Sequence, residues 1–373
     1  MTRLSAVQAA SDALNTLGVD QSAPIDPFEA IEDAGLLLSF QPMTDLLGAI
    51  LPGRPGGVLI NSARPPALQR YTAAHELGHW FMHQDVLSLD TSEAVLGDHG
   101  EARETDAQIF AAHFLMPLEL LHPTARRYGI RRGSITQPEQ AYQTARDMHV
   151  SYEATVRQLV NTRLVTRQNA AQLLNAAPAT IKRRLADGTV LPHARGDVWI
   201  IEHPADQAQV QAFVGDAILL RLRERPATGY RWCADAALPL ASVHPIGSAP
   251  APFSNSRAFA DDAVAPLGEV IPFPATQFPS DVVTLLRDEV LHEDYEVGAT
   301  AVGGSVTRVV AYTASSPGEE SIQLSEVRPF LPEHPATRVD ITTRVRGVPE
   351  VEFRRRLLAA FARDEAEADG WER

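Results

Sequence analysis

The stretch Tyr71-Thr-Ala-Ala-His75-Glu76-Leu-Gly-His79-Trp-Phe-Met-His83 decides the fold of the first half of the chain. It contains the pattern His-Glu-x-x-His, in which two histidines are four residues apart. On an α-helix, residues i and i+4 lie on one face, so the imidazoles of His75 and His79 can point at one metal ion. A catalytic zinc site has three protein ligands and an open position for water. The pattern therefore predicts a zinc site, with Glu76 beside the ligands as the general base.

The alternative interpretation is that two histidines share an amphipathic helix by chance. The apolar neighbours of the motif, among them Leu77 and Trp80, argue against chance because they favour a packed helix. Gly78 leaves room for the close approach of another backbone. His83 lies one turn beyond His79, and we expect it to support a ligand or to pack beside the site rather than to bind the metal.

A third ligand is expected from a second helix. Glu104 and Gln108 share a face of that helix, so Glu104 can bind the ion while Gln108 hydrogen-bonds the other ring nitrogen of a zinc histidine. Asp106 and Glu101 are the alternatives, although carboxylates on a solvated helix surface are common. His113 lies at the apolar end of the helix, and we interpret it as a core residue.

Helical and strand-like patterns alternate around these segments. Asp26 is expected to cap a helix that has Pro27 in its first position. Strands are expected over residues 36–40, 49–51 and 58–60, and the Pro-Gly-Arg-Pro-Gly-Gly between the last two predicts a hairpin. Apolar spacing and flanking prolines predict helices over residues 3–17, 27–34, 65–81, 102–115, 137–147, 151–163, 167–175 and 178–187.

From Gly188 the pattern changes to short apolar runs between Gly, Pro and Asp. These predict strands over residues 198–201, 218–222, 306–312, 321–324 and 338–345. Residues 245–280 are rich in Pro, Ala and Ser and predict a long loop. With a boundary near 186–195, the expected divisions are residues 1–165 as the metal-binding domain, 166–188 as a helical linker, 189–348 as a β domain and 349–373 as a C-terminal helix.

The net charge of the chain restricts the classes of partner that it can bind. The 373 residues carry 47 acidic against 33 basic side chains, a net charge of −14, which argues against broad binding to nucleic acid or membranes. A helix-turn-helix over residues 139–163 could still make the protein a DNA-binding regulator. Its arginines, such as Arg157, are offset by acidic residues such as Glu153, so it is poorly suited to hold phosphates.

Targeting signals and a disulfide framework are not expected. No run of about 18 apolar residues occurs, and the first residues contain no apolar signal core. Cys233 is the single cysteine, which excludes an intramolecular disulfide. We therefore expect a cytoplasmic protein.

Residues 26–165 resemble the ImmA/IrrE family of zinc metallopeptidases in residues 58–62, 70–83, 104–117 and 145–164. The resemblance implies His75, His79 and Glu104 as zinc ligands and Glu76 as the catalytic acid and base. The family usually has Asn or Asp where this chain has Gln108. Its members are linked to the cleavage of helix-turn-helix repressors in phage, mobile-element and stress responses, so the resemblance implies a specific protein substrate of that kind.

Three loops of the second half each predict a turn when taken singly. They contain Thr228-Gly229-Tyr230, Gly303-Gly304 and Arg328-Pro-Phe330. In this order they resemble the inhibitory loops of chagasin-type cysteine peptidase inhibitors, which implies an immunoglobulin-like β-sandwich with the loops at one end. Arg225 and Ala301 depart from the family pattern, where Asn and Gly stand. We therefore expect these loops to bind a substrate or regulatory partner, with inhibition of a cysteine peptidase as the alternative.

The predicted fold class is an α+β, zincin-like metallopeptidase domain with helix-turn-helix-like helices, followed by an all-β, immunoglobulin-like sandwich. Three functions are compatible with this architecture: a zinc endopeptidase whose β domain recruits or regulates, a non-catalytic DNA-binding regulator, and a peptidase inhibitor with a vestigial metal-binding head.

Overall fold

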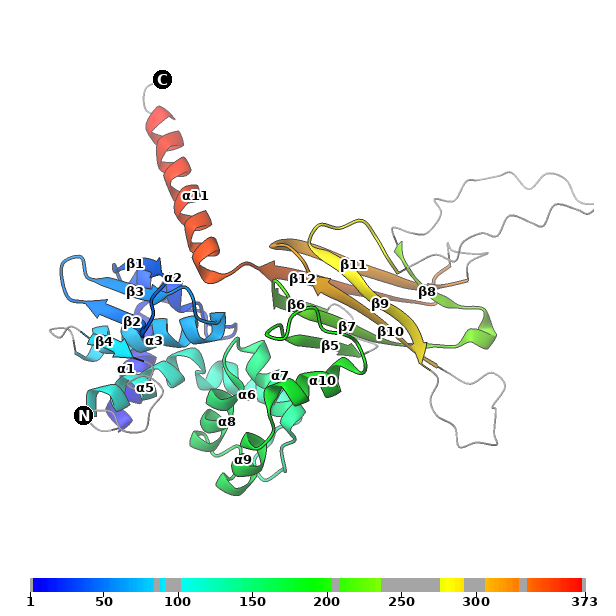
Figure 1. Cartoon of the computed structure of the whole chain (residues 1–373), viewed down its shortest axis with the longest axis horizontal. Coiled ribbons are helices and arrows are strands. Elements are labelled where there is room, and N and C mark those ends of the chain that lie inside the picture. Colours follow the sequence, from blue (N-terminus) through cyan, green and yellow to red (C-terminus); the bar gives the residue numbers. More distant parts are fainter. Residues whose placement is uncertain are drawn as a thin grey trace, which may run out of the picture. The chain divides into compact units, whose positions relative to one another are not determined.

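The computed structural model describes residues 3–83, 88–91, 102–202, 208–235, 276–291, 306–328 and 334–370 (Figure 1). The chain divides into two compact units. The first contains Met1–Val198 and Arg346–Arg373, and the second contains Trp199–Val345. None of the helices in the described ranges is long and apolar enough to cross a membrane.

The first unit contains a four-stranded sheet of order β1-β3-β2-β4. Its strands are β1 (Leu37–Gln41), β2 (Leu46–Leu51), β3 (Gly57–Asn61) and β4 (Ser88–Thr91). Strands β2 and β3 pair antiparallel, with Leu51 opposite Gly57, so the predicted hairpin is confirmed. Strand β1 pairs parallel with β3. Strand β4, which the sequence did not predict, pairs antiparallel with β2.

Helices make up the rest of the first unit. They are α1 (Arg3–Thr16), α2 (Pro27–Asp33), α3 (Pro66–Met82), α5 (Ala102–Leu115), α6 (Leu118–Arg127), α7 (Pro138–Asp147), α8 (Tyr152–Asn161), α9 (Arg167–Leu174), α10 (Pro178–Ala186) and α11 (Pro349–Gly370). Asp26 caps α2 as expected, because its side chain accepts hydrogen bonds from the backbone N–H groups of Phe28 and Glu29. The sequence did not predict α6, which contains Pro123; burial of Leu120 and Leu121 offsets the hydrogen bond that proline cannot donate.

The core of the first unit holds α3 directly against α5. A Cβ atom on Gly78 would lie 3.1 Å from the Phe110 ring and 3.2 Å from the Cα of Ala107. This confirms that Gly78 permits a close approach between helices. Phe110 and Phe114 stack with their ring centroids 5.6 Å apart and are fully buried. The position of α5 relative to α3 is therefore fixed by tight packing.

The C-terminal helix α11 belongs to the first unit, although the second unit precedes it in the sequence. The Phe353 ring packs 5.7 Å from the ring of Phe40 on β1. The guanidinium of Arg356 lies 2.9 Å from the carboxylate of Glu32 and 3.6 Å from that of Asp26. The chain thus leaves the first unit after Val198 and returns to it at Arg346.

The second unit consists of two four-stranded sheets, of order β5-β7-β10-β9 and β6-β12-β11-β8. The strands are β5 (Val198–Glu202), β6 (Ala208–Phe213), β7 (Ala217–Glu224), β8 (Arg231–Ala234), β9 (Val283–Leu291), β10 (Val306–Ala314), β11 (Gly318–Val327) and β12 (Thr337–Arg346), with a 3-10 turn η1 (Pro226–Thr228). One hydrophobic cluster takes Leu220 and Tyr312 from the first sheet and Trp232 and Ile322 from the second, so the sheets share a core.

The sequence predicted five of these strands and missed β6, β8 and β9. Strand β9 carries charged residues in its middle, and β8 is only four residues long, so neither has a clear alternating pattern. Of the predicted loop 245–280, residues 276–280 are described, and they form neither helix nor strand. The immunoglobulin-like topology and the domain ranges 1–165, 166–188, 189–348 and 349–373 stay predictions.

Candidate metal centre

Helix α3 carries the His-Glu-x-x-His motif through the interior of the first unit. It begins at Pro66, whose fixed φ suits the first position of a helix. His75 and Glu76 are fully buried, and His79 is 4% exposed. The helical spacing places the two histidine rings on one face of the helix, edge to face, with centroids 4.8 Å apart.

Glu104 reaches the two histidines from α5. Its Oε2 lies 3.3 Å from Nε2 of His75, and its Oε1 lies 3.4 Å from Nε2 of His79. The two Nε2 atoms are 3.1 Å apart. One ligand-type atom from each of the three residues lies within 4.8 Å of the others. The tight packing of α5 on α3 described above is what brings the carboxylate to the histidine pair.

The donor set fits a metal ion. Two imidazole nitrogens and one carboxylate are the ligand set of several catalytic zinc sites. Hydrogen bonds from His75 and then His79 hold the pKa of the Glu104 carboxyl well below its usual range. Glu104 is therefore ionised near neutral pH, which is the form that binds a cation.

Strand β2 passes directly beside Glu76 at a glycine. A Cβ atom on Gly48 would lie 2.6 Å from Oε1 of Glu76 and 2.4 Å from Cγ2 of Thr72. Any side chain at this position would collide with the carboxylate. Gly48 was not among the residues predicted from the sequence, although an isolated glycine inside an apolar strand is a signal of close approach.

Tyr71 is a second neighbour that the sequence did not single out. It lies one turn before His75, and the two ring centroids are 6.3 Å apart. Burial raises the pKa of the Tyr71 phenol to about 12, so the hydroxyl is neutral at physiological pH. It can therefore donate a hydrogen bond beside the metal centre.

The other predicted residues around the metal lie outside the three-residue cluster. His83 ends α3, with its ring 5.8 Å from the ring of His79. Burial, and then the neighbouring His79, lower the pKa of His83. Asp106 is buried on α5, and Gln108 lies four residues after Glu104 on the same helix. Glu101 is outside the described residues.

His113 contacts another helix instead of the metal cluster. Its Nδ1 lies 3.3 Å from Nε2 of Gln158 on α8. Burial lowers the pKa of His113, which keeps the ring neutral near pH 7. This agrees with the interpretation of His113 as a packing residue.

Two of the three predicted binding loops meet in the second unit. The guanidinium of Arg328 lies 4.6 Å from the centroid of the Tyr230 ring, a cation–π contact. The contact follows from the pairing of β8 with β11, in which Arg231 stands opposite Val327. Thr228 donates a hydrogen bond to the carbonyl of Arg225, and Gly229 has a φ of +77°. Gly303, Gly304 and Phe330 lie outside the described residues.

A buried His-Glu-x-x-His helix with a carboxylate from a second helix defines the metallopeptidase class of site. Residues 32–160 match the family model described as the IrrE N-terminal-like domain, of the Peptidase_M78 family. The resemblance expected for residues 26–165 is thereby confirmed over residues 32–160.

Two proteins named as metalloproteases are similar to part of the chain. The radiation response metalloprotease IrrE of Deinococcus deserti is 38% identical over 97 residues, which cover 26% of this chain and 34% of that protein. The protein of the same name from Deinococcus radiodurans is 38% identical over 97 residues, which cover 26% of this chain and 29% of that protein. The chain thus spans about a third of the length of these relatives.

The solved structures give a second similarity. The crystal structure of the cysteine protease inhibitor EhICP2 from Entamoeba histolytica aligns with 42% of this chain and 99% of its own, at 19% identity and a TM-score of 0.27.

Proposed function

We propose that the protein is a zinc-dependent endopeptidase that cleaves a specific protein. One observation carries the proposal: His75, His79 and Glu104 converge from two helices, with the catalytic-type carboxylate of Glu76 on the same buried helix. The relatives named as radiation response metalloproteases support a role in a stress response.

Zinc is the metal that suits this site best, because it binds imidazole and carboxylate in tetrahedral sites with one open position. When bound, it would act as a Lewis acid and lower the pKa of a water ligand. His75 and His79 would hold it through their Nε2 atoms. Glu104, already ionised, would supply the third ligand and one compensating negative charge.

Glu76 would carry the protons of the reaction. As general base it takes a proton from the attacking water, and as general acid it passes that proton to the leaving amine of the cleaved peptide bond. Its position on α3 between His75 and His79 keeps it beside the metal ligands. The close passage of β2 at Gly48 limits the space into which its carboxylate can turn.

A helix-turn-helix repressor is the proposed substrate, and the cytoplasm is the proposed compartment. The second unit would recruit this substrate or a regulatory partner through the edge that contains Tyr230 and Arg328. Aromatic and arginine side chains are frequent anchors of protein interfaces, and these two are already in contact. The alternative, binding of a cysteine peptidase, would use the same edge.

The proposal can be tested without knowing the substrate. A lysate incubated with the purified protein is searched for new protein N-termini, with Glu76→Gln as the inactive comparison. An acid–base residue contributes about 10²–10⁴-fold, so we expect a few new termini with the wild type and essentially none with the variant. Both proteins should contain zinc.

A control variant, Glu153→Gln, changes an exposed carboxylate on α8 and should cleave like the wild type. Equal cleavage by Glu76→Gln and the wild type would contradict the proposed role of Glu76. Indiscriminate cleavage of many unfolded proteins would contradict the proposed specificity.

A further inference from the structure

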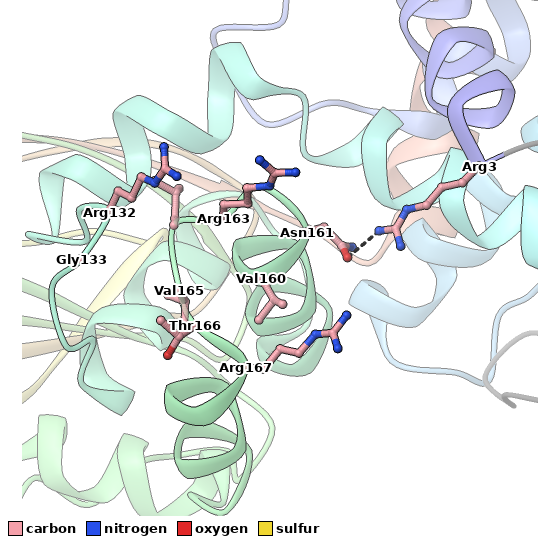
Figure 2. Close-up of a pocket in the computed structure, with 10 residues that line it drawn as sticks. Arg3, Arg132, Gly133, Val160, Asn161, Arg163, Val165, Thr166 and Arg167 are labelled. Carbon is pink, nitrogen blue, oxygen red and sulfur yellow. Dashed lines mark hydrogen bonds between the residues drawn. The ribbon is translucent and has the colours of Figure 1, made fainter.

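A hollow of about 620 Å³ in the first unit is lined by four arginines (Figure 2). None of its lining residues belongs to the metal cluster. The arginines come from separate segments: Arg3 from α1, Arg132 from the segment before α7, Arg163 from the turn between α8 and α9, and Arg167 from the first position of α9. Distant parts of the sequence thus place guanidinium groups around one space.

Among the residues that the structure describes, the lining of this hollow carries positive charge and no negative charge. The ten residues that line it are all described, and none of them is an aspartate or a glutamate. Within the described ranges, no ion pair joins Arg132, Arg163 or Arg167 to a carboxylate, whereas Arg157 on α8 is paired with Glu153. In a chain with a net charge of −14, such a local excess of positive charge favours an anionic ligand.

The backbone around the hollow is held in place. Leu164 and Val165 both donate their N–H groups to the carbonyl of Leu159, and Arg163 donates to that of Val160. Arg163 has a φ of +61°, in the left-handed region in which many helices end. This conformation and the hydrogen bonds define the backbone of the turn. At the α1 side, Arg3 donates a hydrogen bond of 2.5 Å to the side chain of Asn161.

The first turn of α9 adds to the positive potential. Thr166 caps this helix, with its side chain accepting from the N–H of Asn169. The other N–H groups of a first helical turn have no partner within the helix, and the helix dipole is positive at this end. Phosphate groups commonly bind at such positions, and guanidinium groups match phosphate oxygens in pairs.

Part of the remaining wall is apolar, beside the polar side chains of Asn161 and Thr166. Val160, Leu164 and Val165 line the hollow between the arginines. Its volume falls within the range of about 300–1,000 Å³ that is usual for small-molecule sites. A ligand with both a polyphosphate chain and a flat organic ring would satisfy the two parts of the lining. We propose that this hollow binds a nucleoside triphosphate or diphosphate, with phosphates on the arginines and the base on the apolar wall.

Calorimetric titration of the full-length, metal-loaded protein with ATP tests this proposal. We expect one ATP per chain and a weaker interaction at high salt, because ionic attraction is screened. Arg163→Gln and Arg167→Gln should each raise the Kd about tenfold, since each removes a charged hydrogen-bond donor. Arg157→Gln removes a charge from the same region without lining the hollow, and its Kd should equal that of the wild type.

Three further measurements distinguish a nucleotide site from the metal centre, from a simple anion site and from a folding defect. His79→Ala should bind ATP like the wild type, which separates the hollow from the metal centre and from the proposed peptidase function. Inorganic triphosphate should bind more weakly than ATP because it lacks the base. Circular dichroism of each variant shows that it is folded.

Several results would overturn the proposal. These are no saturable binding of ATP, equal Kd values for the wild type and Arg163→Gln, and equal binding of ATP and inorganic triphosphate. Displacement of ATP by duplex DNA, with tighter binding of longer duplexes, would show that the hollow belongs to a nucleic-acid-binding surface and is not a nucleotide site.

Discussion

The two units each contain a buried cluster of titratable side chains, and the clusters differ in what neutralises them. In the second unit, Glu224 is fully buried between the guanidinium groups of Arg231 and Arg308, and Asp288 lies 2.6 Å from Arg308. Two carboxylates are thus balanced by two arginines. In the first unit, two imidazoles and one carboxylate point their electron pairs at a common space. The cluster of the second unit, whose charges balance one another, therefore stabilises the fold. The cluster of the first unit, whose ligand atoms converge, suits a bound cation.

The pKa directions agree with this difference. Burial alone would raise the pKa of Asp288, but hydrogen bonds from Arg308 and Thr276 outweigh it and lower the pKa. Burial also lowers the pKa of Arg308, but the hydrogen bond and the attraction to Asp288 outweigh burial and raise the pKa. Both partners are therefore held in their charged forms by each other. Cys233 lies among them with its thiol pKa raised to about 11 by burial, so it is unreactive at neutral pH.

The largest expected effect is on metal content. His79→Ala removes one of three converging ligands and should lose most of its zinc, whereas His83→Ala should keep about one zinc per chain. Metal analysis of both purified variants measures this difference. Similar zinc content in the two variants would contradict the assignment of His79, and not His83, as a zinc ligand. Full zinc occupancy in Glu104→Ala would move the third-ligand role to another carboxylate.

Glu224→Gln should destabilise the second unit. Removing one partner of a buried ion pair costs about 3–5 kcal/mol, because the other charges stay buried. Urea unfolding monitored by tryptophan fluorescence should show an earlier transition, while zinc content stays unchanged. Glu319→Gln is the matched control, since its pair with Arg344 is exposed and worth about 0–1 kcal/mol. Equal effects of the two variants would show that the buried cluster carries no special stability.

Chelation of zinc should lower the stability of the first unit alone. A ligand present at a hundred times its Kd stabilises the folded state by about 2.7 kcal/mol, and that contribution is lost on its removal. Hydrogen exchange of peptides from α3 and α5 should increase after chelation, while exchange of β7 and β11 should not. Increased exchange in both units would show that metal binding is coupled to the second unit.

Gly48→Ala is expected to give the smallest of these effects. The added Cβ would lie 2.6 Å from Oε1 of Glu76, so the carboxylate must shift, and we expect cleavage to slow by about tenfold with zinc retained. Gly57→Ala on the neighbouring strand is the control, because its Cβ would meet its nearest atom at 3.6 Å, an ordinary contact. Equal rates for Gly48→Ala and the wild type would show that β2 does not position Glu76.

The metal motif was predictable because its chemistry is local. The i, i+4 spacing of His75 and His79 fixes their common face as soon as the helix forms. Glu104 could be selected as a ligand candidate, but the sequence left Asp106 and Glu101 open. Only the packing of α5 on α3 brings the Glu104 carboxylate to the two Nε2 atoms. Gly48 was missed for the same reason, since its role depends on the packing of β2 against the distant helix α3, which carries Glu76.

The sequence by itself determined the helices of the first half other than α6, the β2–β3 hairpin and the change to strands after residue 188, because these follow from periodicity and turn residues within short windows. The tertiary structure alone decided which distant groups meet. It joins α11 to the first unit through Phe353 and Phe40, and it gathers Arg3, Arg132 and Arg163 around one hollow. These contacts depend on long-range packing, and no pattern within a short window of sequence indicates which distant residues will pack together.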